Sequence, residues 1–449
     1  MSDQKSTTGE FSRRELVKRG AVVAGAAAVP SALPAGFTRV TERVTASKGK
    51  LVIGAFDDPA LIPFKAKILP AFTKATGIKV ELLLQPYDAF FAKAFQDGST
   101  KAGQFDIYIM DDPWIPQYAA AGILEDLGSH GVQASKDYAP PFIDLGFWPP
   151  RTGPRVKGFE KDKPKLIALP TIGDLQTLTY RNDVFKSGPP RTWAELVKVA
   201  GAAQKAGKIK DGIVFRGVKG NPIVTSWYPI FLSYGGKFFD DKWNITFNSP
   251  EGKAAAEFFV GPLKKLAPKG VAAFDSTEEG AAILGGQAAA IIQYSGNAIK
   301  SDDPAESKVV GKLDFGVVPK QVKAIAQIGI FIHGVSASAP NKDNAITFMK
   351  WFAQNSVQTQ LARAGDLPVK LPAFMDAAAA KKHRLLPIAL KQIKAGALAR
   401  PRTPDWSKVE ELLGTELNKA LVAGSGGGAA LDRAAKSATA YLKQQGYYK

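Results

Sequence analysis

The stretch that decides the fold is KLVIGAF, residues 50–56, an apolar run with the length of a buried strand. Two similar runs follow at residues 78–84 and 105–110, and residues 63–76 and 88–96 between them carry apolar side chains at helical spacing. Strand, helix, strand, helix, strand is the order of a parallel sheet with crossover helices. The sequence therefore predicts an α/β fold.

Polar and aromatic side chains follow the end of each of these three predicted strands. In open α/β sheets, ligands bind beyond the carboxyl ends of the strands. We therefore expect ligand contacts from the residues at those ends, which are Phe56, Asp58, Gln85, Tyr87, Asp111, Asp112 and Trp114.

The rest of the chain alternates short apolar strands with helices and ends in a mostly helical region. Residues 166–170 and 175–180 read as strands on either side of a Thr-Ile-Gly-Asp connection. A helix is predicted to start after Thr192, with Thr192 as N-cap and Glu195 completing a capping box.

The N-terminal region carries an export signal. Arg13 and Arg14 precede an alanine- and valine-rich run that extends to Ala35. Adjacent arginines followed by an apolar segment and small residues are typical of the twin-arginine export route. We expect a periplasmic protein that uses the twin-arginine translocase, with the signal peptide cleaved near Ala35 or Ala46.

Composition narrows the class of protein further. Of 449 residues, 45% are apolar and none is cysteine, so disulfides, thiolate catalysis and an N-terminal lipid-anchor cysteine are excluded. Without the leader, about 400 residues remain, enough for two lobes. No second apolar run reaches the roughly 18 residues that span a bilayer, so we expect a soluble mature protein.

The net charge of +18 raises the question of an anionic partner. Lysines and arginines are spread along the whole chain, and the densest cluster, residues 381–384, has Arg400 and Arg402 near it in sequence. These cations do not alternate with aromatics as in a single-strand reader. We expect a solvated basic surface and no nucleic-acid site, while an anionic ligand or envelope partner stays open.

The usual catalytic and metal-binding patterns do not occur. The three histidines, His130, His333 and His383, lie far apart without zinc-ligand spacing, and there is no G-x-S-x-G motif. We predict no catalytic residue, no metal and no cofactor. Carboxylates and flat aromatic rings at loop positions instead suit sugar recognition. Trp227, Tyr294 and Trp406 join the candidates on this ground, with core packing as the alternative for Trp227.

Several segments, in the right order over nearly all of the mature chain, match one family. They are residues 105–111 with 118–124, residues 180–185, PRTWAEL at 190–196, NSPEG at 248–252, and GQAAA at 286–290. The chain resembles the extracellular solute-binding proteins of ABC transporters, in the sugar-binding group that includes maltose-binding protein.

This resemblance implies a two-lobe periplasmic binding protein fold of type II. Each lobe would be a mostly parallel sheet flanked by helices, and hinge strands would join the lobes around a ligand cleft. The expected boundaries are residues 1–46 for signal peptide and linker, 47–172 plus 333–372 for lobe one, and 173–332 plus 373–449 for lobe two.

The resemblance also implies roles for particular residues. Asp174 falls at the hinge, where relatives place an acidic ligand contact, and Trp406 falls where they stack an aromatic ring on sugar. Trp227 aligns with an aromatic residue that lines the second lobe, and Asp58 and Asp111 or Asp112 align with acidic contacts on the first. Residues 291–297 lack the family's common tryptophan, so Tyr294 or Asn297 would substitute.

The resulting expectation is a monomeric receptor of an ABC importer that captures a sugar, oligosaccharide or polyol and delivers it to the permease by hinge closure. Three alternatives stay open. The same fold could take a glycerophosphodiester, an acidic sugar or a polyamine. A secreted carbohydrate-active enzyme would need two carboxylates of unlike pKa across the cleft. A non-specific envelope adhesin would rest on charge alone.

Overall fold

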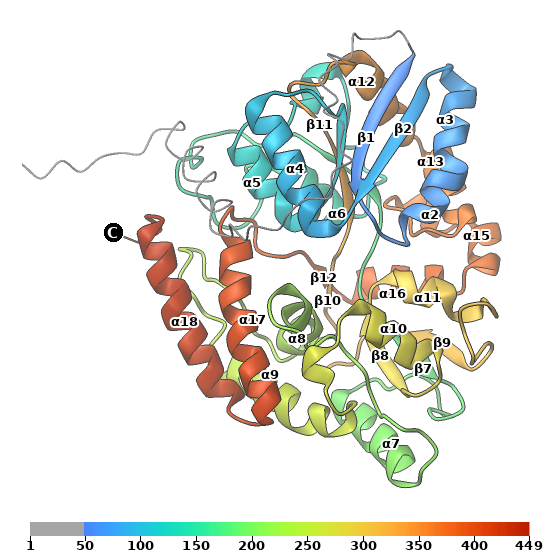
Figure 1. Cartoon of the computed structure of the whole chain (residues 1–449), viewed down its shortest axis with the longest axis vertical. Helices are drawn as coiled ribbons and strands as arrows, with labels where there is room; N and C mark the ends of the chain where they lie inside the picture. The colour runs from blue at the N-terminus through green and yellow to red at the C-terminus, as the bar shows by residue number, and fades with distance from the viewer. Residues whose placement is uncertain (1–48, 449) are drawn as a thin grey trace, which may run out of the picture.

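The computed structural model describes residues 49–448, apart from the side chain of Asn297, and forms two lobes (Figure 1). The predicted signal peptide, residues 1–46, lies outside the described residues. One lobe contains the sheet around β1 (Lys50–Phe56), and the other contains the sheet around β7 (Thr177–Arg181). Each lobe has its own large hydrophobic core.

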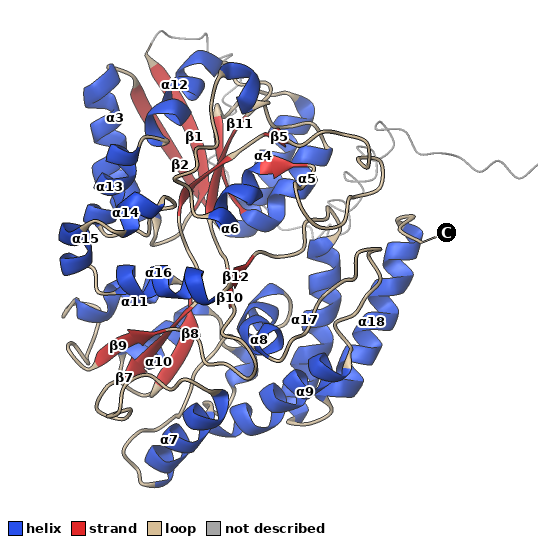
Figure 2. Cartoon of the chain, turned by 180° about the vertical axis from the view of Figure 1, so that it is seen from behind, coloured by secondary structure: helices blue, strands red, loops and turns tan. Residues whose placement is uncertain are grey.

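The first sheet has the strand order β2-β1-β3-β11-β6. Its strands are β1, β2 (Lys79–Gln85), β3 (Ile107–Asp111), β6 (Leu169–Ile172) and β11 (Phe331–Val335). Strand β1 runs parallel to both β2 and β3, as predicted, whereas β11 is antiparallel to β3 and β6. The ends of β1, β2 and β3 therefore meet at one edge of the sheet, the edge that faces the second lobe (Figure 2).

Helices pack on both faces of this sheet. The helix predicted at residues 63–76 is one continuous run of α2 (Leu61–Pro63), a π-helical turn η1 (Phe64–Ile68) and α3 (Leu69–Thr76). Gly77 ends it in the left-handed conformation with φ of 78°. The other helices of this lobe are α4 (Tyr87–Thr100), α5 (Ile115–Ala120), α6 (Pro140–Ile143), α12 (Lys342–Phe352) and α13 (Asn355–Ala364).

Short elements complete the first lobe. A two-stranded ribbon pairs β4 (Phe147–Trp148) with β5 (Lys165–Leu166). Single 3₁₀ turns are η2 (Asp112–Trp114), η3 (Leu127–His130) and η4 (Asp144–Gly146).

The second sheet differs from the predicted parallel arrangement. Its order is β8-β7-β9, and both β8 (Ala290–Gln293) and β9 (Leu313–Gly316) run antiparallel to β7. Among the described residues, parallel pairing in this lobe is limited to the two-residue pair of Ala326–Gln327 with Ala397–Leu398 and to isolated bridges, of which Asp211 with Ala288 and Val214 with Ile291 extend the sheet beyond β8. The expectation of a mostly parallel sheet is therefore corrected here, because strand periodicity predicts burial but not the direction in which the chain returns.

Helices surround this sheet and form a layer beside it (Figure 2). Their bounds are α7 (Trp193–Lys205), α8 (Asn221–Ser233), α9 (Pro250–Phe258), α10 (Ser276–Leu284), α11 (Ser295–Ile299), α17 (Trp406–Ala423) and α18 (Gly427–Gln444), with short turns η5 (Phe259–Leu263), η6 (Lys264–Leu266), η7 (Val271–Ala273) and η8 (Lys300–Asp302). Thr192 caps α7 as predicted, because its Oγ1 accepts the Glu195 N–H at 3.1 Å. The Glu195 carboxylate, however, accepts from the Arg191 N–H at 2.8 Å and not from Thr192.

The chain crosses between the lobes through segments that lie side by side. One crossing joins β6 to β7, and a second joins β10 (Ala326–Gln327) to β11. They are hydrogen-bonded through Gln176 N–H to Gln327 O at 3.0 Å and Gly329 N–H to Asp174 O at 3.1 Å. A third route runs through α14 (Leu371–Phe374), α15 (Ala377–Lys382), α16 (Leu385–Ala395) and β12 (Ala397–Leu398), which pairs with β10.

Within residues 49–448, no helix combines the length and the apolar character that crossing a bilayer requires. The same residues contain no group of three or more acidic or histidine side chains placed to hold a metal ion.

Candidate functional site

Aromatic rings gather at the edge of the first sheet that faces the second lobe. The Phe56 ring centroid lies 5.1 Å from Tyr87 and 5.4 Å from Trp114, both edge to face, and stacks on Phe331 at 5.1 Å. Tyr87 and Trp114 are 4.8 Å apart. Three of the predicted residues, from the ends of β1, β2 and β3, thus form one aromatic group.

Hydrogen bonds tie this aromatic group to the acidic end of β3. The Trp114 indole N–H donates to the Tyr87 hydroxyl at 2.9 Å, and that hydroxyl donates to Asp111 Oδ2 at 2.8 Å. Burial and the Asp111 charge raise the pKa of Tyr87 well above its usual value, so its hydroxyl keeps the proton that it donates.

Arg400 connects this acidic end to the segment between β12 and α17. Its guanidinium pairs with Asp111 Oδ1 at 2.5 Å and also with the Asp112 carboxylate. The Arg400 side chain is 3% exposed and that of Asp112 is fully buried. Burial raises the pKa of Asp112 to about 7 even though Arg400 opposes the rise.

Arg400 and Arg402 do not belong to a solvated basic surface. Arg402 is inserted among backbone carbonyls, where its guanidinium donates to Leu145 O and Phe147 O at 3.0 Å each. Burial lowers the pKa of Arg402 to about 10. The expectation of a solvated surface is therefore wrong for Arg400 and Arg402. Their partners lie far away in sequence, so the sequence around each arginine does not reveal the contacts. Arg384, in the dense cluster, is 40% exposed, as expected.

A second group of carboxylates lies at the hinge. Asp174, 7% exposed, accepts the Ser295 N–H at 2.8 Å through Oδ1, and Asp58 Oδ1 accepts the Ala60 N–H at 2.9 Å. Burial raises the pKa of Asp174 well above its usual value, and the Asp58 charge adds to that rise. For Asp58, burial raises the pKa to about 6, with the charges of Asp111 and Asp57 acting in the same direction.

Tyr294 reaches the same region from the second lobe. Its hydroxyl donates to Gln327 Oε1 at 2.7 Å, and its ring covers Gly329, where an added Cβ would lie 2.4 Å from Tyr294 Cε1. After burial, the charges of Arg400 and Asp111 are the main influences on the pKa of Tyr294, which is raised. Tyr294 therefore contacts the hinge at Gln327 and Gly329, and the charges at the end of β3 act on it.

We call these residues the interlobe cluster. Its predicted members are Phe56, Asp58, Tyr87, Asp111, Asp112, Trp114, Asp174 and Tyr294, and its further members are Arg216, Asp366, Arg400 and Glu410. The first group comes from the sequence analysis. The second was missed, because each of its members lies in a polar segment whose burial depends on partners far along the chain.

The other predicted residues lie apart from these contacts. Trp227 and Trp406 are fully buried in the core of the second lobe, where Trp227 stacks on Phe231 at 4.4 Å and Trp406 meets Phe238 edge to face at 4.9 Å. Gln85 lines a groove along α4. The side chain of Asn297 lies outside the described part of the chain.

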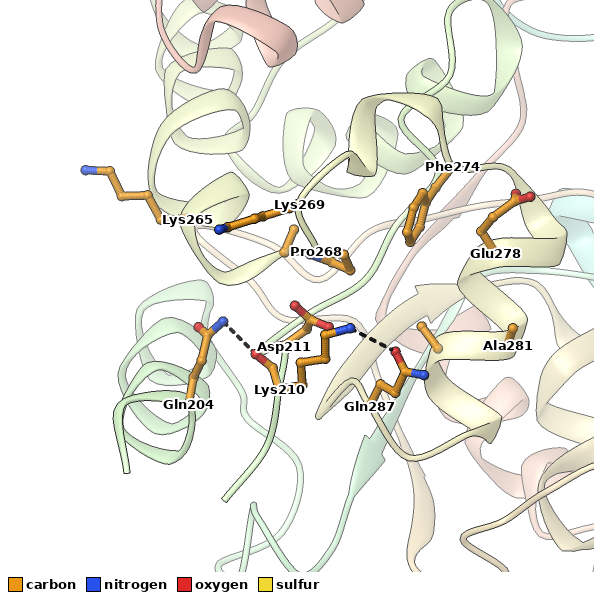
Figure 3. A pocket seen from close by; sticks show the side chains of 12 residues that line it. Gln204, Lys210, Asp211, Lys265, Pro268, Lys269, Phe274, Glu278, Ala281 and Gln287 are labelled. Carbon is orange, nitrogen blue, oxygen red and sulfur yellow. Dashed lines mark hydrogen bonds between the residues drawn. The ribbon is translucent and has the colours of Figure 1, made fainter. Parts of the chain in front are cut away.

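A separate groove of about 730 Å³ lies on the second lobe. In Figure 3, Lys210 and Asp211 line one wall, and Pro268 and Lys269 line the other. Asp211 is 5% exposed, and its Oδ2 makes no hydrogen bond with any described residue. None of the predicted site residues lines this groove.

The family follows from comparison with known proteins. A model of the family described as bacterial extracellular solute-binding protein matches residues 60–359. The chain belongs to this family. The family resemblance and the two-lobe α/β fold predicted from the sequence are thereby confirmed. Membership also places the protein outside the cytoplasm, in the periplasm or beyond it.

Individual relatives have low sequence identity to this chain, but their matches extend over more than half of it. A probable amino-acid ABC transporter periplasmic-binding protein of Sinorhizobium fredii is 25% identical over 422 residues, which cover 90% of this chain and 93% of that protein. The mannitol-binding protein of Pseudomonas aeruginosa is 26% identical over 263 residues, which cover 57% of each chain.

Solved structures of similar fold include an ABC transporter solute-binding protein of Agrobacterium radiobacter K84 in complex with ribitol. It has a TM-score of 0.73 and 24% identity, and the match covers 87% of this chain and 98% of that one. A maltose-bound T. maritima protein has a TM-score of 0.75 and 22% identity over 87% and 99% of the two chains. Both likenesses concern the fold.

Proposed function

We propose that this protein is the solute receptor of an ABC importer and that it captures a sugar, oligosaccharide or polyol between its two lobes. The observation that carries the proposal is the interlobe cluster, in which aromatic rings from the first lobe stand beside hinge carboxylates and Tyr294 of the second. Flat rings cover the apolar face of a sugar ring, while carboxylates accept hydrogen bonds from its hydroxyl groups.

The charge of the interlobe cluster disfavours an anionic solute. The cluster has six acidic side chains, Asp58, Asp111, Asp112, Asp174, Asp366 and Glu410, and two guanidinium groups, those of Arg216 and Arg400. Burial raises the pKa of Asp58, Asp112, Asp174, Asp366 and Glu410, so a bound anion would oppose the ionisation of these groups further. A chain of net charge +18 thus surrounds its candidate site with acidic groups. The relatives that carry ribitol, mannitol or maltose support neutral polyhydroxylated solutes as the first class to test.

The proposed ligand contacts are the predicted residues of the interlobe cluster. Gln85 and Asn297 stay predictions as ligand contacts. Trp227 and Trp406 also stay predictions as ligand contacts, since both are buried as Phe56 and Trp114 are, and the indole N–H of each makes no hydrogen bond with a described residue.

The proposed cycle breaks no bond. Solute bridging both lobes stabilises the closed form, and the closed form docks on the membrane permease. We place the lobe boundaries at the crossings near residues 173–176, 328–330 and 373–384. Export of a monomer by the twin-arginine route, with cleavage near Ala35 or Ala46, completes the proposal.

Thermal unfolding of the mature protein with a panel of neutral solutes tests the proposal. The panel contains ribitol, mannitol, maltose, glucose and glucitol. A solute that binds the folded state alone and is present at 100 times its Kd adds about 2.7 kcal/mol of stability. With about 2.1 cal/mol/K per residue of unfolding entropy over about 400 residues, that is a rise of about 3 °C in Tm. If anions such as glycerophosphodiesters raise Tm and no neutral solute does, the proposed solute class is wrong.

A further inference from the structure

We propose that the solute carries a protonated amine and that Asp58, Asp174 and Asp366, the acidic pole of the interlobe cluster, receive it. This inference rests on the proposed function and narrows it from sugars and polyols to their amino derivatives. The sequence analysis did not select Asp366.

Backbone pairing sets Asp366 opposite Asp174. Gly173 and Leu367 form an antiparallel bridge, with the Gly173 N–H donating to Leu367 O at 2.7 Å. Asp174 and Asp366 flank this isolated bridge at the positions that an antiparallel pairing would set opposite each other, and the Asp174 charge acts on the pKa of Asp366. A Cβ on Gly173 would lie 2.4 Å from Pro368 O, so the close approach that creates this pair requires glycine.

The Asp366 carboxyl group is buried without a hydrogen-bond partner among the described residues. It is 2% exposed, and neither of its carboxylate oxygens makes a hydrogen bond with any described residue. The Phe64 N–H lies near enough to oppose the rise in the pKa of Asp366, but that N–H already donates to Leu61 O. After burial, the charges of Asp174 and Asp58 are the main causes of that rise.

The two arginines of the interlobe cluster, Arg216 and Arg400, contact side chains outside the acidic pole. Arg400 pairs with Asp111 and Asp112. Arg216 donates to the Thr225 hydroxyl and lies 3.6 Å from Asp275, and its influence on the pKa of Asp58 is smaller than those of Asp111 and Asp57. Within residues 49–448, neither of these arginines therefore pairs with Asp58, Asp174 or Asp366.

Like charges placed opposite each other on neighbouring strands are destabilising, and a buried carboxylate without a partner is costly. An ammonium group has three donors and a positive charge, so one group would satisfy several acidic oxygens at once. A hydroxyl at the same place supplies one donor and no charge. The acidic pole thus selects the amine over the hydroxyl.

Calorimetric titration of the mature protein at pH 7.5 with matched pairs tests the inference. The pairs are 1-amino-1-deoxy-D-glucitol with D-glucitol, and D-glucosamine with D-glucose, and N-acetyl-D-glucosamine serves as the uncharged control. We expect at least one amine to bind about tenfold more tightly than its hydroxyl partner, which is the factor that about 1.4 kcal/mol produces. The acetylated control should lose that advantage.

The variant Asp366→Asn keeps the shape of the side chain and removes its ability to become a carboxylate when an ammonium group binds. It should bring the amine and the hydroxyl partner to within about threefold of each other, whereas Asp211→Asn, in the groove of Figure 3, should leave the difference unchanged. Comparing the amine with its hydroxyl partner in the unmodified protein tests the inference even if the variant does not fold. Equal or tighter binding of the hydroxyl members would overturn the inference and leave the proposed function in place. Failure of both series to bind would overturn the inference, and the proposed function would then be decided by the thermal-unfolding panel with ribitol, mannitol and maltose.

Discussion

Removing the Arg400 guanidinium should destabilise the protein strongly. Arg400 is 3% exposed, pairs with Asp111 and Asp112, and links the segment before α17 to the first lobe. Arg400→Met removes the charge and keeps most of the side-chain volume. Two carboxylates then stay buried without a cation, and breaking a buried pair by removing one partner costs about 3–5 kcal/mol.

The expected shift in Tm follows from the size of the chain. About 400 residues at about 2.1 cal/mol/K each give an unfolding entropy of about 0.8 kcal/mol/K. A loss of about 3–5 kcal/mol therefore lowers Tm by about 4–6 °C if the lobes unfold together. Differential scanning calorimetry at pH 7.5 measures this shift.

The matched control is Arg384→Met. Arg384 also pairs with two carboxylates, Asp302 at 2.8 Å and Asp314 at 3.2 Å, but its side chain is 40% exposed. Exposed pairs contribute about 0–1 kcal/mol, so this variant should lower Tm by about 1 °C or less. Equal shifts for the two variants would refute the reasoning that burial makes the Arg400 pairing important.

Four further predictions follow from the same contacts. Lowering the pH from 8.5 to 6 should raise Tm, because burial raises the pKa of Asp58 to about 6, of Asp112 to about 7 and of Glu279, in α10, to about 8. Each of these acids stabilises the fold when it is protonated, and that contribution is lost as the pH rises through its folded pKa. A Tm that falls as the pH is lowered over this range would contradict these pKa shifts. Trp406→Ala should cost about 3–5 kcal/mol of folding stability by denaturant titration, because the ring is fully buried; a loss of solute affinity at unchanged stability would return Trp406 to the ligand site. Asp174→Asn should weaken solute binding at least tenfold by calorimetry while circular dichroism stays unchanged; unchanged affinity would remove Asp174 from the site. Thr192→Ala should cost about 1 kcal/mol through loss of the N-cap of α7, and a Thr192→Ser control should retain most of that stability.

Local pattern predicted much of the first lobe. The structure contains the three strands predicted at residues 50–56, 78–84 and 105–110 and the helix end at Gly77. These elements could be predicted because the spacing of apolar residues within a short segment indicates whether it forms a helix or a strand. The direction of β8 and β9 could not be predicted in this way, since it depends on how the chain returns through the second lobe.

The sequence analysis selected the residues of the candidate site that lie at strand ends. It did not select those whose position depends on pairing with distant parts of the chain. Asp111 is the last residue of β3 and Trp114 ends the turn η2 that follows it, so the position of the strand was enough to select both. Asp366 comes just after a helix-ending Gly365 and looks like an ordinary turn residue until Leu367 pairs with Gly173. From the sequence alone, Arg400 is expected at the surface, because its partner Asp112 is 288 residues away. Trp406 stands at a helix start, where the sequence does not say whether the ring faces a ligand or the core.

The central claim is that solute binds between the lobes, and a crystal structure of the mature protein with the tightest-binding member of the solute panel tests it most directly. The account predicts solute density between the lobes, with a polar group of the solute within hydrogen-bond distance of Asp174 and a ring or carbon chain against Tyr294 or Trp114. Solute bound in the groove beside Asp211, or bound on one lobe without contact to the hinge, would contradict it.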